Sequence, residues 1–343
     1  MDKFVMETES SLLLRDIYNR LQDDESKEIY KARTLFSLTD DRLCLKDVVR
    51  KMTVARSMLE ELNKHSGQDF VLFGAGTWGK AILFFFPEIK WKCVVDNKQA
   101  GKKLGDYEII SFAELQKMKN IYVVVAILFK FMEINTQLVE AGFSSNNFLL
   151  LGEIAEKKQY FDLPYLRFGE NEVFVDGGGY DGNVARRFAE VTGYQYRKIL
   201  MFEPNKHLFG VCQQQMQKMD HCMVIQKGIS DRAGVIRFIE AGEGSRIADG
   251  ETDSVEIETV TLDEYIDEKV TFIKMDIEGA EFAALKGAEK VIRNQKPKLA
   301  ISVYHRREDI WEIPKLLIKY NPDYKFYLRV YSFTGNDAVL YAI

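Results

Sequence analysis

The sequence has no long apolar segment and no run of basic residues. Its longest apolar run covers residues 121–129, far short of the roughly 20 residues that a membrane-spanning helix needs. Lysine and arginine never occur in runs longer than two, and the formal net charge is −5, whereas proteins that bind nucleic acid usually carry a basic patch. We therefore expect neither a membrane span nor a nucleic-acid partner.

The sequence is also poor in cysteine, and its first residues do not resemble a secretory signal. Four cysteines are spread along the chain without the close spacing of metal ligands. The start lacks the basic segment followed by an apolar stretch that a secretory signal requires. These absences favour a cytoplasmic location.

Residues 1–66 contain neither glycine nor proline and are rich in charged helix formers. Between Leu45 and Leu62, apolar residues recur at helical spacing, and Asp40 or Asp41 can begin the helix and Gly67 end it. We expect two or three helices here, serving packing or formation of a homo-oligomer. A chain of 343 residues exceeds what one core usually organises, so two domains should follow.

Residues 67–155 alternate short apolar runs with amphipathic segments, which predicts a Rossmann-like parallel α/β domain. Gly74, Gly76 and Gly79 form a glycine fingerprint after an apolar strand, and Asp96 follows 20 residues after Gly76. This spacing fits a nucleotide site, where the acid binds ribose hydroxyls. Tight turns also select glycine when nothing is bound, so a scaffold without a ligand is the alternative. The segment resembles the small Rossmann-type domain found ahead of sugar-modifying enzymes.

A charged and aromatic connector at 156–170, with a helix-breaking Pro164, precedes a second βα series that we assign to a domain at 171–343. Its first strand leads to Asp176 and a glycine turn. The turn consists of Gly177, Gly178, Gly179, Tyr180 and, two residues on, Gly182. Glycines there let the backbone pass close beneath a ligand. On spacing alone, a dinucleotide loop fits equally well.

Four acids in this domain follow expected strands, namely Asp176, Glu203, Asp231 and Asp276, with Pro204 directly after Glu203. Open α/β sheets bind ligands at the carboxyl edge of their strands. Carboxylates at this edge chelate ribose hydroxyls in both dinucleotide and S-adenosylmethionine sites. We therefore expect these acids to surround a cofactor.

The domain resembles the FkbM-type methyltransferase family over about half of the chain. The matching segments, in order, are 175–182, 202–204, 261–263, 272–281, 285–288 and 296–305. The resemblance implies an S-adenosylmethionine-dependent enzyme that methylates a hydroxyl oxygen of a sugar, glycan or polyketide-type product, with the glycine turn and the acids holding the cofactor. It departs from much of the family at Tyr180, where an asparagine is usual.

Three residues near the expected cofactor edge are candidates for catalysis: Asp276, Glu278 and His305. Asp276 and Glu278 share a face if the strand continues, and a neutral imidazole at His305 could accept a hydroxyl proton near pH 7. Together they could hold a divalent cation. The structural alternatives are a hydrogen-bonded histidine and, for Glu278 and Glu281, stabilisation of a helix N-terminus.

The last segment, 324–343, carries a hairpin pattern, and methyltransferase sheets end in an antiparallel strand. A loop at 242–247 could bring Ser245 and Arg246 to the site. The expected fold is therefore two Rossmann-like α/β domains behind N-terminal helices. A nucleotide-sugar oxidoreductase is the main rival, although residues 68–155 lack its Tyr-x-x-x-Lys dyad. A non-enzymatic scaffold for glycan assembly is the other.

Overall fold

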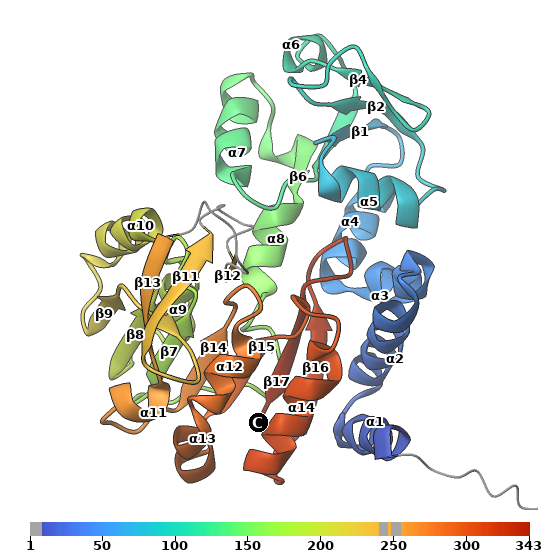
Figure 1. The fold of residues 1–343 in the computed structure, drawn as a ribbon. Coiled ribbons are helices and arrows are strands. Elements are labelled where there is room, and N and C mark those ends of the chain that lie inside the picture. The colour runs from blue at the N-terminus through green and yellow to red at the C-terminus, as the bar shows by residue number, and fades with distance from the viewer. Residues whose placement is uncertain (1–8, 240–245, 248–254) are drawn as a thin grey trace, which may run out of the picture. The chain divides into compact units, whose positions relative to one another are not determined.

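The computed structural model describes residues 9–239, 246–247 and 255–343 (Figure 1). The chain divides into two compact units. The large unit comprises Met1–Asp40, Tyr160–Arg329 and Ala338–Ile343, and the small unit comprises Asp41–Gln159 and Val330–Asp337. This division differs from the expected one at both ends, because the N-terminal helices are shared between the units and an eight-residue connection near the C-terminus belongs to the small one.

The N-terminal helices α1 (Glu9–Arg20) and α2 (Asp24–Thr39) belong to the large unit, where both pack against α14 (Asp309–Tyr320). Polar contacts also join residues 23–26 to residues 328–329. Arg329 donates to Asp23 Oδ2 at 2.7 Å, and the backbone N–H of Leu328 donates to Ser26 Oγ at 2.9 Å. These contacts explain why residues far apart in sequence fold together.

The helix expected between Leu45 and Leu62 is two helices, α3 (Lys46–Lys51) and α4 (Thr53–Lys64), preceded by the 3₁₀ turn η1 (Arg42–Leu45). Met52 separates them with an extended backbone (φ −63°, ψ 152°). Val48 and Val49 before the break and Val54, Ala55 and Met58 after it are all buried. The break therefore lets both short helices bury their apolar sides.

The large unit is built on a seven-stranded sheet in the order β16-β17-β15-β14-β7-β8-β9. Strands β15, β14, β7, β8 and β9 are parallel, and β17 pairs with β15 antiparallel. This confirms the predicted doubly wound sheet with an antiparallel C-terminal hairpin. The strands are β7 (Val173–Gly177), β8 (Lys198–Phe202), β9 (Cys222–Ile225), β14 (Phe272–Met275), β15 (Lys298–Ser302), β16 (Phe326–Val330) and β17 (Ala338–Ala342).

Stacked phenylalanines hold the centre of this sheet to its first helix. The ring of Phe174 on β7 stacks on Phe188 of α9 and on Phe272 of β14, with centroids 4.5 and 5.0 Å apart. Phe161 and Phe168, from the connector, contact the same cluster. Each ring removes a large apolar area from water.

The remaining helices of the large unit are α9 (Asn183–Val191), α10 (Lys206–Met216), α11 (Leu262–Tyr265), α12 (Glu281–Lys286) and α13 (Glu289–Gln295).

A second sheet, with the order β10-β13-β11-β12, was not expected from the sequence. Its strands are β10 (Gly228–Ile229), β11 (Gly234–Ile239), β12 (Arg246–Ile247) and β13 (Val255–Val260). The alternation of apolar and charged residues along β13 was the available signal. Arg246 lies in β12 rather than in a loop, and Ser245 lies outside the described residues.

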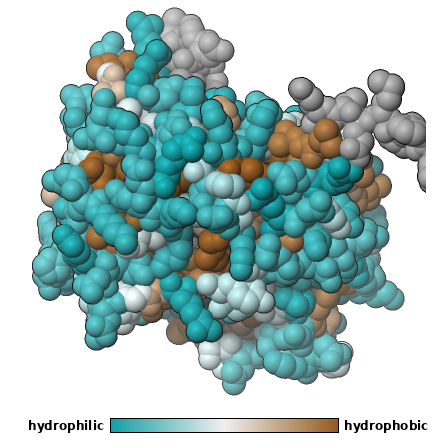
Figure 2. Space-filling view, turned by 90° about the horizontal axis from the view of Figure 1, so that it is seen from below, coloured by the Kyte–Doolittle hydropathy of each residue, from teal (hydrophilic) through white to brown (hydrophobic). Residues whose placement is uncertain are grey.

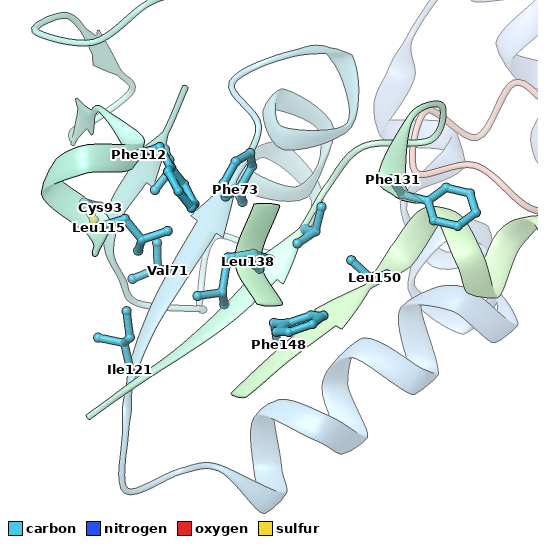
Figure 3. Close-up of a cluster of buried hydrophobic side chains, with 13 residues drawn as sticks. Val71, Phe73, Cys93, Phe112, Leu115, Ile121, Phe131, Leu138, Phe148 and Leu150 are labelled. Carbon is cyan, nitrogen blue, oxygen red and sulfur yellow. The ribbon is translucent and has the colours of Figure 1, made fainter. Parts of the chain in front are cut away.

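The small unit has a six-stranded sheet in the order β3-β4-β2-β1-β5-β6, parallel except for β3. From β4 onward this is the strand order of dinucleotide-binding folds. Figure 3 shows its core, where apolar side chains of β1, β5 and β6 meet those of α6 and α7. The elements are β1 (Asp69–Phe73), α5 (Thr77–Phe85), β2 (Trp91–Val95), β3 (Lys103–Leu104), β4 (Tyr107–Ile110), α6 (Phe112–Leu115), β5 (Ile121–Val125), α7 (Phe131–Glu140), η2 (Ser145–Asn147), β6 (Phe148–Leu150) and α8 (Leu151–Lys158).

No helix in the described residues is both long and apolar enough to cross a membrane. The face drawn in Figure 2 is mostly hydrophilic, with apolar residues in small separate patches.

Candidate active site

The glycine turn after β7 is held against the ends of two neighbouring strands. The backbone N–H groups of Gly178 and Gly179 donate to the carbonyl oxygen of Phe202, at 3.0 and 3.1 Å. Gly178 has φ +81°, and a Cβ on it would lie 2.0 Å from the backbone oxygen of Asp276. Only glycine permits this backbone conformation and this close approach. The turn therefore lies between the carboxyl ends of β8 and β14.

Lys274 holds the glycine turn in place, although it is not among the site residues expected from the sequence. Its side chain is buried on β14, and its ammonium donates to the carbonyl oxygens of Gly177 and Gly178 at 3.1 and 2.7 Å. The same nitrogen lies 3.0 Å from Oδ1 of Asp176, which is fully buried. Burial lowers the pKa of Lys274, but the charges of Asp176 and Asp276 outweigh it, so the pKa is raised. Lys274 is therefore charged and organises the turn.

Glu203 follows β8 and has a fixed carboxylate. Its Oε2 accepts from the backbone N–H of Tyr180 and its Oε1 from that of Asn205, both at 2.9 Å. Burial raises the pKa of Glu203, and these two hydrogen bonds oppose the rise. A carboxylate oxygen has two lone pairs, so each oxygen can still accept one hydroxyl. Tyr180 lies in the left-handed region (φ +50°) at the same turn.

Asp276, directly after β14, accepts hydrogen bonds from two tyrosines. Tyr160 donates to Oδ2 at 2.7 Å and Tyr304 to Oδ1 at 3.0 Å. Burial raises the pKa of Asp276, but the charges of Lys274 and His305 and the tyrosine hydrogen bond outweigh it, so the pKa is lowered. Neither tyrosine is among the site residues expected from the sequence. Tyr160 lies in the connector, 116 residues before Asp276, and no local pattern marks it.

The strand ends at Met275, so the condition under which Asp276 and Glu278 would share a strand face is not met. Glu278 instead adopts a left-handed backbone (φ +56°). The two carboxylates meet at His305, whose Nε2 lies 3.5 Å from Oδ1 of Asp276 and 3.5 Å from Oε2 of Glu278. The three predicted catalytic residues are therefore neighbours, because both carboxylates lie beside the imidazole of His305.

The opposite side of the imidazole contacts Glu281. Nδ1 of His305 lies 2.9 Å from Oε1 of Glu281, which also accepts from the backbone N–H of Ile277 at 2.7 Å. Burial lowers the pKa of His305, but the hydrogen bond to Glu281 and the surrounding carboxylates raise it to about 9. The base role predicted from the sequence requires the neutral imidazole, and this role stays a prediction.

Residues 176–329 match the model of a protein family described as the methyltransferase FkbM domain. This region is an FkbM methyltransferase domain. The whole chain is also similar in structure to a methyltransferase FkbM from Methylobacillus flagellatus KT, with 20% identity and a TM-score of 0.50 over 90% of this chain and 100% of the other. At 20% sequence identity, this structural similarity shows a shared fold.

Two further solved structures are more distantly similar to the chain. An rRNA methylase from Streptococcus thermophilus has 15% identity and a TM-score of 0.34, covering 50% of this chain and 86% of its own. Fibrillarin from Aeropyrum pernix, solved with bound S-adenosyl-L-methionine, has 13% identity and a TM-score of 0.35, covering 57% and 81%. Neither score carries an argument about this chain. No curated protein matches the sequence.

Three other residues of the FkbM domain are predicted from the sequence to contact the cofactor. Asp231 follows β10 of the second sheet, not a strand of the seven-stranded sheet, and its exposed carboxylate lies 3.5 Å from Nζ of Lys286. Gly182 begins α9 with φ +79°. Pro204 is half-buried directly after Glu203. A cofactor role for these residues stays a prediction.

The glycine fingerprint of the small unit has packing explanations. A Cβ on Gly79 would lie 2.0 Å from the carbonyl oxygen of Gly74, which itself has φ +113°. Asp96 accepts from the backbone N–H groups of Ala75 and Lys98, at 3.3 and 2.9 Å. Gly76 begins α5, and a Cβ there would meet nothing within 4 Å. Packing therefore accounts for Gly74 and Gly79 without a ligand.

Proposed function

We propose that the FkbM domain binds S-adenosylmethionine and transfers its methyl group to a hydroxyl oxygen of a small molecule or glycan. The observation that carries this proposal is the fixed carboxylate of Glu203, held by two backbone N–H groups beside the glycine turn. It lies at the carboxyl edge of a doubly wound sheet, where such folds bind ligands. The family match of residues 176–329 supports methyl transfer as the reaction.

The residues at this edge fit the cofactor by the chemistry of their donors. Glu203 would accept the ribose hydroxyls, and the turn from Gly177 to Gly182 would supply close backbone approach. Asp176 would contribute through Lys274, because its carboxylate is buried against that ammonium. The bound sulfonium would supply an activated methyl group. The protein must then align the acceptor, and alignment of this kind contributes roughly 7–11 kcal/mol in favourable cases.

The carboxylates of Asp276 and Glu278 are the proposed acceptors of the hydroxyl proton. Asp276 is held ionised, because its pKa is lowered. Glu278 is the more accessible of the two, with 38% of its side chain exposed. His305 would orient both carboxylates, because its Nε2 lies 3.5 Å from an oxygen of each. The hydroxyl proton of the acceptor would pass to one of these carboxylates as the acceptor oxygen takes the methyl group.

Calorimetry of the full chain with S-adenosylmethionine and with NAD tests the cofactor. We expect S-adenosylmethionine to bind and Glu203→Gln to weaken it at least about tenfold, since an amide NH₂ would face one of the two backbone N–H groups. Glu289→Gln is the matched control, because that carboxylate is partly exposed and pairs with Arg293 on α13, outside the proposed site. Binding of NAD alone would favour the oxidoreductase, and binding of neither would favour the scaffold.

The acceptor of the methyl group depends on the loops that form the substrate pocket. Substrate pockets of α/β enzymes are made by loops, which vary freely on one fold. Mass spectrometry of metabolites from cells with and without the protein would identify the product. A species heavier by one methylene on a glycan would support a glycan acceptor, and an unchanged glycan profile would count against it.

A further inference from the structure

A cluster of metal-ligating side chains lies beside the proposed cofactor edge. Asp276, Glu281 and His305 each place one ligand atom so that all three atoms lie within 4.8 Å of one another. Glu281 is fully buried, and 10% of the His305 side chain is exposed. Oε2 of Glu281 has no hydrogen-bond partner among the described residues. A buried carboxylate oxygen without a partner is costly, so Oε2 is available to a ligand.

The charge of this cluster points to a cation. Three carboxylates, those of Asp276, Glu278 and Glu281, approach the single imidazole of His305 within 3.5 Å. The carboxylates outnumber the imidazole three to one, and the side chains of Glu281 and His305 are only 0% and 10% exposed. Burying unbalanced charge is strongly unfavourable unless a counter-charge is present. A divalent cation would supply that counter-charge.

We propose that Asp276, Glu281 and His305 bind a divalent transition-metal ion, and that the nearby carboxylate of Glu278 adds to its electrostatic attraction. Carboxylates together with an imidazole suit Mn²⁺ or Zn²⁺, whereas Ca²⁺ prefers oxygen ligands alone. The ligands are already oriented. Ile277 donates to Glu281, and Tyr160 and Tyr304 donate to Asp276. Such supporting hydrogen bonds are typical of metal sites.

The function of the ion rests on the proposed methyl transfer, but its binding does not. An ion beside Asp276 would lower the pKa of a coordinated acceptor hydroxyl and so favour its attack on a methyl group. Binding of the ion can therefore be measured without the acceptor and without S-adenosylmethionine.

Titration of the metal-free full chain with Mn²⁺, followed by electron paramagnetic resonance, tests the site. We expect one bound Mn²⁺ per chain, with a ¹⁴N hyperfine coupling from His305. Asp276→Asn and His305→Gln should each weaken binding at least about tenfold, and His305→Gln should abolish the coupling. The surface variant Glu289→Gln should bind as the wild type does, because its carboxylate lies on α13 outside the cluster.

Glu278→Gln provides the test if Asp276→Asn and His305→Gln fail to fold. The side chain of Glu278 is partly exposed, so the substitution should be tolerated. We expect severalfold weaker Mn²⁺ binding and retained ¹⁴N coupling. The inference is overturned if the wild type binds no Mn²⁺ or Zn²⁺, or if the bound Mn²⁺ shows no ¹⁴N coupling. Calorimetry with S-adenosylmethionine on the metal-free chain separates the two proposals, since cofactor binding without metal binding removes only the inference.

Discussion

At the scale of single residues, the site depends on charged side chains that the surrounding fold holds in fixed places. Lys274 is the clearest case, because one buried ammonium contacts Asp176 and two carbonyl oxygens of the glycine turn. A buried ion pair contributes little net stability but is expensive to break. Its contribution here is to specify the conformation of the turn.

Glu172 makes a second buried ion pair, which yields a prediction about pH. It accepts from Lys298 Nζ and from the backbone N–H of Gly169, both at 2.8 Å, and from the Thr271 hydroxyl. Burial raises its pKa, but these contacts outweigh burial and lower the pKa below the ordinary value of 4.5. The folded state therefore binds its proton less readily than the unfolded state, so this stabilisation is present above about pH 4.5 and is lost as the pH falls further.

We expect Glu172→Gln to lower the free energy of unfolding by about 2 kcal/mol at pH 7, the scale of a hydrogen bond to a charged group. The difference from the wild type should shrink as the pH falls below 4.5. Urea denaturation of both proteins from pH 7 to pH 3.5 measures it. A difference that stays constant through this range would show that the ion pair does not stabilise the fold.

At the scale of elements, the turn between β7 and α9 is fixed by close packing of backbone on backbone. Gly178→Ala would place a methyl group 2.0 Å from the backbone oxygen of Asp276 at a φ of +81°. Neither atom belongs to a flexible side chain that could move aside. We expect a loss of about 2–4 kcal/mol in the free energy of unfolding, from strain and overpacking together.

Gly210→Ala is the matched control for the turn. Gly210 lies inside α10, and a Cβ there would meet nothing within 4 Å. Alanine should stabilise the helix by about 0.5–1 kcal/mol. Thermal unfolding of both variants should therefore give shifts of opposite sign, and equal stability of Gly178→Ala and the wild type would refute the packing described for the turn.

At the scale of the whole molecule, the two compact units carry separate glycine turns, and the proposed cofactor site lies in only one. Hydrogen exchange followed by mass spectrometry, with and without S-adenosylmethionine, tests this assignment. We expect slower exchange at residues 177–182 and 203–205 of the large unit, because a ligand slows exchange where it stabilises the fold. Residues 74–79 of the small unit should be unaffected. Slower exchange at 74–79 instead would move the cofactor to the small unit.

The local sequence determined the class of the fold and the sheet edge at which the proposed site lies. Apolar runs that end in acids predict buried parallel strands, and this placed Asp176, Glu203 and Asp276 at strand ends correctly. The glycine turn and the C-terminal hairpin could also be predicted from short stretches of sequence, because turn geometry depends on neighbouring residues. The pattern failed at Met52 and in the second sheet, where tertiary packing overrides short-range preference.

The tertiary structure alone decided which side chains meet. Tyr160 contacts Asp276 across 116 residues, and His305 contacts three carboxylates because β15 lies beside β14. The connection Val330–Asp337 joins the small unit, where Ser332 accepts from Trp78 Nε1 at 3.0 Å. Such contacts depend on the path of the whole chain and on the burial of charge, which no local pattern encodes. The sequence thus located the acids, whereas the fold made Glu281 a member of their cluster.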